Sequence, residues 1–102
     1  MKTTFITVIA LAFTASAQLV KLEGAKAVQY KEASGAKLFL HVFNPEGHKT
    51  TDARPAIVFF FGGGWNGGTP KQFEPHCHYL ARRGMVAITA EYRVKSRNKT
   101  SP

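Results

Sequence analysis

The chain has 102 residues, enough for one domain at most, and its 44% hydrophobic content is ordinary for a globular protein, which excludes a disordered chain. Its formal net charge of +8 is typical of proteins that bind nucleic acid or anionic surfaces. However, the basic residues are scattered, apart from a group at 93–99, whereas a nucleic-acid-binding surface gathers them on one face. We therefore expect no nucleic-acid partner and interpret residues 93–99 as a solvated segment.

The first residues have the pattern of a secretory signal peptide. Lys2 provides a positive start, residues 5–13 form an apolar stretch too short to span a membrane, and residues 15–17 are a small-residue cleavage site. We predict cleavage after Ala17, so that residues 1–17 are the signal peptide and residues 18–102 are the mature, secreted or periplasmic protein.

Residues 27–43 predict an antiparallel β-hairpin. Residues 27–31 form a first short strand, residues 33–35 (Ala-Ser-Gly) are a turn signal, and residues 37–43 alternate with period two. His41 lies within the second strand, where a histidine more often has a structural role than a catalytic one.

The next strand of the prediction ends in a glycine loop. Ile57 to Phe61 are five successive apolar residues, β-branched and aromatic, which favours a strand buried on both faces. Three glycines and Trp65 follow directly. Glycine does not restrict the backbone, so the chain can leave the strand there with its N–H groups exposed. Such groups can bind an anion or a developing negative oxygen.

A helix and a further strand follow the loop. Phe73, Cys77 and Leu80 recur at helical spacing, Pro75 fits the first turn, and Gly84 suits the C-terminal cap. Cys77, the sole cysteine, is expected to be a buried free thiol without an internal disulfide. With residues 85–91 as a second buried strand, residues 56–91 predict one parallel βαβ unit.

The glycine loop can be interpreted in more than one way. Residues 62–67 match the Gly-x-Gly-x-x-Gly dinucleotide-binding pattern, and Glu91 ends the following strand. That fingerprint needs a helix that begins at the glycines, whereas residues 67–70 (Gly-Gly-Thr-Pro) keep this chain irregular and Trp65 occupies the turn. The other reading, a tight connection with no chemical role, stays open.

Residues 57–65 resemble the His-Gly-Gly-Gly-Trp segment of α/β-hydrolase-fold esterases, in the lipase and feruloyl- or acetyl-xylan-esterase branch. Residues 90–93 (Ala-Glu-Tyr-Arg) are similar to the Asp-Tyr-Arg that ends the family's fourth strand. The resemblance covers roughly residues 27–95. It implies that residues 18–102 are the N-terminal portion of an incomplete α/β-hydrolase domain, truncated before the nucleophile elbow.

The same resemblance implies a site and a reaction. Gly63 and Gly64 would offer oxyanion-hole N–H groups, and Gly62 and Trp65 would shape the loop. The parent protein would be a serine carboxylic-ester hydrolase acting on an ester substrate, such as a plant-polysaccharide or small acyl ester. The resemblance implies no metal or other cofactor.

The sequence departs from the family pattern in two ways. Phe61 stands where the family usually has the histidine that holds the loop in shape, which puts the loop geometry in doubt. The chain also contains no Gly-x-Ser-x-Gly, so nucleophile, acid and base are absent and the chain itself is predicted to be inactive. The alternative is a small secreted non-catalytic protein whose basic surface binds an anionic polymer.

Two smaller groups of residues resemble a metal site and a glycosylation site. Glu74, His76 and His78 resemble metal ligands in composition, but helix positions two apart point to different sides, so we expect no metal site. Asn98 begins an Asn-Lys-Thr sequon and is a candidate for glycosylation.

Overall fold

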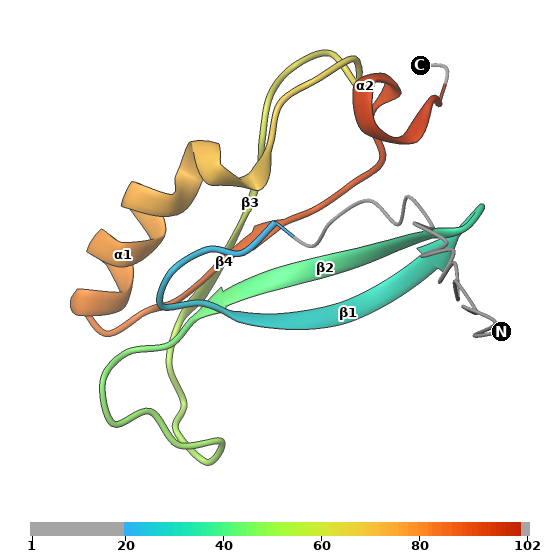
Figure 1. Ribbon diagram of the computed structural model, residues 1–102. Helices are drawn as coiled ribbons and strands as arrows, with labels where there is room; N and C mark the ends of the chain where they lie inside the picture. The colour runs from blue at the N-terminus through green and yellow to red at the C-terminus, as the bar shows by residue number, and fades with distance from the viewer. Residues whose placement is uncertain (1–19, 101–102) are drawn as a thin grey trace, which may run out of the picture.

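The computed structural model describes residues 20–100, so the predicted signal peptide and its cleavage site lie outside the described residues. The chain forms a four-stranded mixed sheet in the order β1-β2-β4-β3 (Figure 1). Its strands are β1 (Lys26–Ala33), β2 (Ala36–Phe43), β3 (Ala56–Phe60) and β4 (Val86–Ala90). Strand β2 is antiparallel to both β1 and β4, and β3 is parallel to β4. The predicted class, a β-hairpin followed by a parallel βαβ unit, is confirmed.

The hairpin turn explains the register of β1 and β2. Ser34 and Gly35 both have positive φ angles, 50° and 78°, as in the two-residue turns whose twist matches that of the flanking strands. Between Gln29 and Lys31 the register shifts, so that Tyr30 is the extra residue of a β-bulge. A bulge turns a side chain away from the regular alternation, and this one directs Tyr30 toward the end of β4.

The predicted helix is α1 (Glu74–Arg82), preceded by a short 3₁₀ turn, η1 (Pro70–Phe73). Pro75 lies in its first turn, where the missing N–H has no helical acceptor to lose. Beyond the helix, the N–H groups of Gly84 and Met85 donate to the carbonyls of Ala81 and Leu80, at 3.1 Å each. This is a Schellman cap, and the φ of +91° at Gly84 shows why glycine suits it.

The helix covers one face of the sheet, where it packs mainly on β4 and also reaches β2 (Figure 1). The core on this face consists of Leu22, Phe43, Cys77 and Ala87, each at most 2% exposed. Ile57 and Phe59 of β3 pack against it, and the Phe59 ring stacks on Phe73 with centroids 4.7 Å apart. The predicted burial of the Cys77 thiol is confirmed.

The predicted burial of β3 on both faces is wrong for the described part of the chain. Val58 is 45% exposed and Phe60 is 66% exposed, because β3 lies at the edge of the sheet and no described element covers its second face. Cross-strand pairing places Val58 beside Ile88 and Phe60 beside Ala90. The face opposite α1 is therefore apolar across several strands yet open.

Among residues 20–100, no helix has both the length and the apolar character that a membrane span requires.

Candidate functional site

The glycine loop after β3 is a tight turn whose two sides touch. A Cβ at Gly63 would lie 2.3 Å from the Gly67 carbonyl oxygen, and one at Gly68 would lie 2.3 Å from the Gly62 carbonyl oxygen. Neither contact is possible for a side-chain-bearing residue, so glycine is required at both positions. The Gly63 carbonyl accepts the N–H groups of Asn66 and Gly67, at 3.1 and 3.4 Å, which closes the turn.

The loop leaves two successive N–H groups without acceptors within the described residues. The Gly62 N–H donates to Gln72 Oε1 at 2.8 Å, whereas the N–H groups of Gly63 and Gly64 have no such partner in residues 20–100. Both glycines are exposed and have positive φ angles, +145° and +59°. Chemically, a pair of neighbouring N–H donors can bind an oxygen that carries negative charge.

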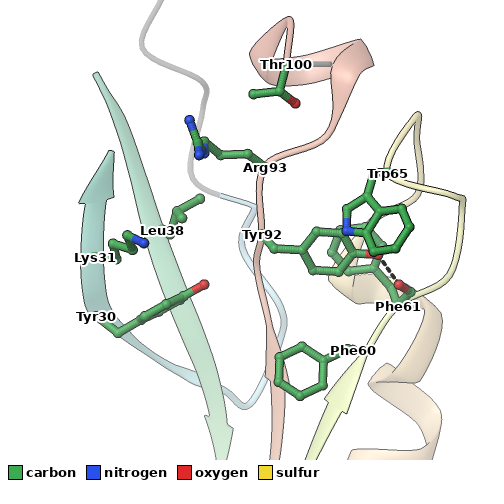
Figure 2. A pocket seen from close by; sticks show the side chains of 9 residues that line it. All are labelled: Tyr30, Lys31, Leu38, Phe60, Phe61, Trp65, Tyr92, Arg93 and Thr100. Atoms are coloured by element: carbon green, nitrogen blue, oxygen red, sulfur yellow. Dashed lines mark hydrogen bonds between the residues drawn. The ribbon is translucent and has the colours of Figure 1, made fainter. Parts of the chain in front are cut away.

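Phe61, where the esterase pattern has histidine, anchors the start of the loop through its ring. It is 2% exposed and stacks on Tyr92, with centroids 4.1 Å apart and ring planes 12° apart. The Tyr92 hydroxyl donates a hydrogen bond to the Phe61 carbonyl oxygen (Figure 2). The two linked sequence motifs thus meet in space, and aromatic packing holds this end of the loop without a histidine.

Glu91 fixes the chain just before Tyr92. Its N–H donates to the Phe39 carbonyl at 2.9 Å, and its carboxylate Oε2 accepts the Phe39 N–H at 3.2 Å. Its Oε1 lies 2.9 Å from His41 Nε2, with both residues buried, so His41 lies in this pair and not at the glycine loop. The Glu91 carbonyl accepts the Tyr30 hydroxyl. Burial, and then the charge of Glu91, raise the pKa of Tyr30 above 10.0, so the hydroxyl remains a donor.

A cleft of about 830 Å³ opens beside the loop, on the side of the sheet opposite α1 (Figure 2). Its walls combine aromatic side chains with two cationic ones; the lining residues are Tyr30, Lys31, Leu38, Phe60, Phe61, Trp65, Tyr92, Arg93 and Thr100. In Figure 2 the stacked Phe61 and Tyr92 rings form one wall, and Tyr30 points toward them from β1. The cleft is thus continuous with the open apolar face of the sheet.

The sequence interpretation missed the segment after β4. Lys95, Ser96 and Lys99 are exposed, as a solvated segment requires. However, residues 95–98 also form a short helix, α2 (Lys95–Asn98), that hydrogen-bonds to the glycine loop. Arg97 donates to the Gly68 carbonyl, and its guanidinium lies over the Phe61 ring. No sequence signal pairs these residues, because the loop and α2 are about thirty residues apart.

The other candidate residues lie away from the loop. Burial, and then the charge of Glu74, raise the pKa of the Cys77 thiol to about 11, so it is protonated and unreactive at neutral pH. Glu74 and His78 form a weak pair at 3.8 Å, while the His76 ring contacts Phe73. No cluster of three metal-ligating side chains occurs in residues 20–100. Asn98 accepts the Val94 N–H through its side chain, and its glycosylation stays a prediction.

The strand order, the βαβ unit and the glycine loop after β3 together define the N-terminal part of an α/β-hydrolase fold of the kind found in esterases. The chain is similar to the thermophilic esterase Est2 of Thermogutta terrifontis with propionate bound: 48% identity, a TM-score of 0.76, and coverage of 80% of this chain and 30% of that one. The same enzyme phosphorylated by paraoxon gives 51% identity and a TM-score of 0.72, with coverage of 76% of this chain and 30% of that one.

Two further comparisons complete the picture. Neuroligin-like protein glit-1 of Caenorhabditis elegans is 40% identical over 58 residues, which are 56% of this chain and 8% of that protein. No family model matches the chain. The chain therefore spans less than a third of the solved esterases and a small part of the neuroligin-like protein.

Proposed function

We propose that this chain is the N-terminal part of a secreted serine carboxylic-ester hydrolase, in which the N–H groups of Gly63 and Gly64 form the oxyanion hole. One observation carries the proposal: two N–H groups without acceptors among the described residues follow β3, in a segment closely similar to a bacterial esterase. The glycine-only contacts at Gly63 and Gly68 support it, since they hold the loop in one shape.

The mechanism assigns this loop an electrostatic role. A serine Oγ attacks the ester carbonyl while a base takes its proton, and negative charge develops on the carbonyl oxygen. The Gly63 and Gly64 N–H groups stabilise that charge, and one such donor is worth roughly 10²–10³ in turnover. The chain has no Gly-x-Ser-x-Gly, so residues 18–102 alone should hydrolyse no ester above background.

The first test reads the gene beyond the codon for Pro102. A continued frame with Gly-x-Ser-x-Gly within about a hundred residues supports the proposal. Its absence would favour the alternative of a basic protein that binds an anionic polymer. Secretion has its own test, because N-terminal sequencing of exported protein should begin at Gln18.

The second test removes one N–H from the complete protein without altering the backbone shape. Glycolic acid, introduced at Gly64 by nonsense suppression, replaces the amide by an ester. We expect kcat for a short-chain aryl ester to fall about 10²–10³-fold with little change in KM. Glycolic acid at Gly47 is the control: it makes the same amide-to-ester change at an exposed glycine of the loop between β2 and β3, whose N–H has no acceptor in residues 20–100. Gly64→Ala is not a suitable control, because an alanine at the φ of +59° is strained even though its Cβ has room. Full activity of the backbone ester would reject the oxyanion role.

A further inference from the structure

Three successive residues of α2 contact three carbonyls of the glycine loop. The Lys95 N–H donates to the Trp65 carbonyl at 2.8 Å, and the Ser96 N–H donates to the Asn66 carbonyl at 2.9 Å. Arg97 Nη1 donates to the Gly68 carbonyl at 2.7 Å. The first N–H groups of any helix lack acceptors within that helix, so here the loop carbonyls satisfy them.

Arg97 also reaches the opposite end of the loop. Its guanidinium carbon lies 5.5 Å from the centroid of the Phe61 ring, within the range of a cation–π interaction. One side chain thus contacts Phe61, where the loop begins, and Gly68, near its end. A lysine could donate to the Gly68 carbonyl but has no planar group to lie on the Phe61 ring.

We propose that Lys95, Ser96 and Arg97 act as a strap that positions the oxyanion loop, with Arg97 as the principal positioning residue. The inference deepens the proposed function and rests on it for its catalytic consequence. Gly63 and Gly64 lie between the anchored positions, so the strap determines where their N–H groups point. Trp65 is held at a φ of +61°, a conformation that a non-glycine residue keeps only when its surroundings enforce it.

The strap itself can be tested without any ester hydrolysis. Hydrogen exchange of the Lys95 and Ser96 amides reports its opening, and fluorescence anisotropy of Trp65, the sole tryptophan, reports the mobility of the loop. Arg97→Met removes the donor and the planar cation but keeps an apolar stem. We expect both amides to exchange about three- to tenfold faster, the effect of losing one partly exposed charged hydrogen bond, and the anisotropy of Trp65 to fall.

A matched control replaces another arginine that lies over an aromatic ring, away from the glycine loop. Arg83 lies over the Tyr79 ring at 4.9 Å on α1 and does not contact the loop, so Arg83→Met should leave both readouts unchanged. Equal exchange rates in Arg97→Met and Arg83→Met would overturn the strap. If circular dichroism shows that Arg97→Met is unfolded, Arg97→Lys takes its place. We expect an acceleration of at least about twofold, because lysine has no planar group to stack on the Phe61 ring while it donates to the Gly68 carbonyl. No acceleration there would equally overturn it.

The catalytic consequence is measured in the complete protein. Arg97→Met should lower kcat more than it raises KM, because misdirected N–H groups lose transition-state stabilisation first. If Arg97→Met exchanges faster but the complete wild-type protein hydrolyses no ester, the proposed function is rejected and the strap is kept. A fall in kcat without faster exchange would reject the strap and keep the proposed function.

Discussion

Both faces of the sheet carry apolar side chains, but the two faces differ in how they are covered. Along β3, Ile57 and Phe59 pack against the core under α1, while Val58 and Phe60 point to the other side and are 45% and 66% exposed. On the helix side, burial supplies the stability. On the open side, the cleft and the glycine loop are held by hydrogen bonds and ring stacking. Hence one strand both anchors the core and presents the candidate site.

The largest expected effect is on stability, when a phenylalanine is replaced by alanine on each face of the sheet in turn. Phe43→Ala should lower the free energy of unfolding by about 3–5 kcal/mol, because it opens a cavity in the core. Phe60→Ala, at a residue 66% exposed, should cost less than about 1 kcal/mol in the same chain. Urea denaturation measures both. Equal losses would mean that something covers the open face, and the contrast between the faces would fail.

The reactivity of the Cys77 thiol reports how completely α1 covers the helix side of the sheet. With the thiol pKa raised from 9.0 to about 11, roughly a hundredfold less thiolate is present near pH 8 than in the unfolded chain. Alkylation by iodoacetamide should therefore be at least that much slower in the native protein than in urea. The stability linked to this proton is complete below pH 9 and is lost as the pH rises through 11. Equal alkylation rates would show that the covered face opens freely.

Whether the sequence predicts a feature of the fold depends on how far apart in the chain the interacting residues lie. The hairpin follows from Ser34 and Gly35, and α1 from Pro75 and Gly84, because those signals act within a few residues. The pairing of β2 with β4 joins segments far apart in the sequence. A pattern of apolar residues therefore cannot predict that β3 lies at the edge of the sheet or that Phe60 is exposed.

The same distinction applies to the candidate site. The glycines and Trp65 were recognised as a loop from the sequence itself, and the close contacts of Gly63 and Gly68 explain why glycines are needed there. Apart from Gln72, the partners that hold the loop come from residues 92–97, and nothing local to either segment predicts that they meet. The oxyanion role of Gly63 and Gly64 stays a prediction until the backbone ester is assayed.

A smaller effect on stability is expected on the open side, when the Tyr92 hydroxyl is removed. Tyr92→Phe keeps the stack on Phe61 and removes the hydrogen bond to its carbonyl. We expect a loss of about 0.5–1.5 kcal/mol in the free energy of unfolding, with lower anisotropy of Trp65. Tyr79→Phe, at a half-exposed tyrosine on α1, is the matched control. If both variants lose equal stability, the Tyr92 hydroxyl does not hold the loop.

The smallest effect concerns Tyr30, the bulged residue on the open side. Burial, and secondarily the charge of Glu91, raise its pKa above 10.0, so the folded chain holds this proton more tightly than the unfolded chain does. The linked stability is complete below pH 10 and is lost as the pH rises through the folded pKa. Phenolate absorbance of the wild-type chain minus that of Tyr30→Phe isolates the titration. In Glu91→Gln the pKa should fall but stay above 10.0, since burial is the larger cause. A Tyr30 that titrates like free tyrosine in the wild-type chain would show that its hydroxyl is not held against Glu91 and that β1 does not brace this end of β4.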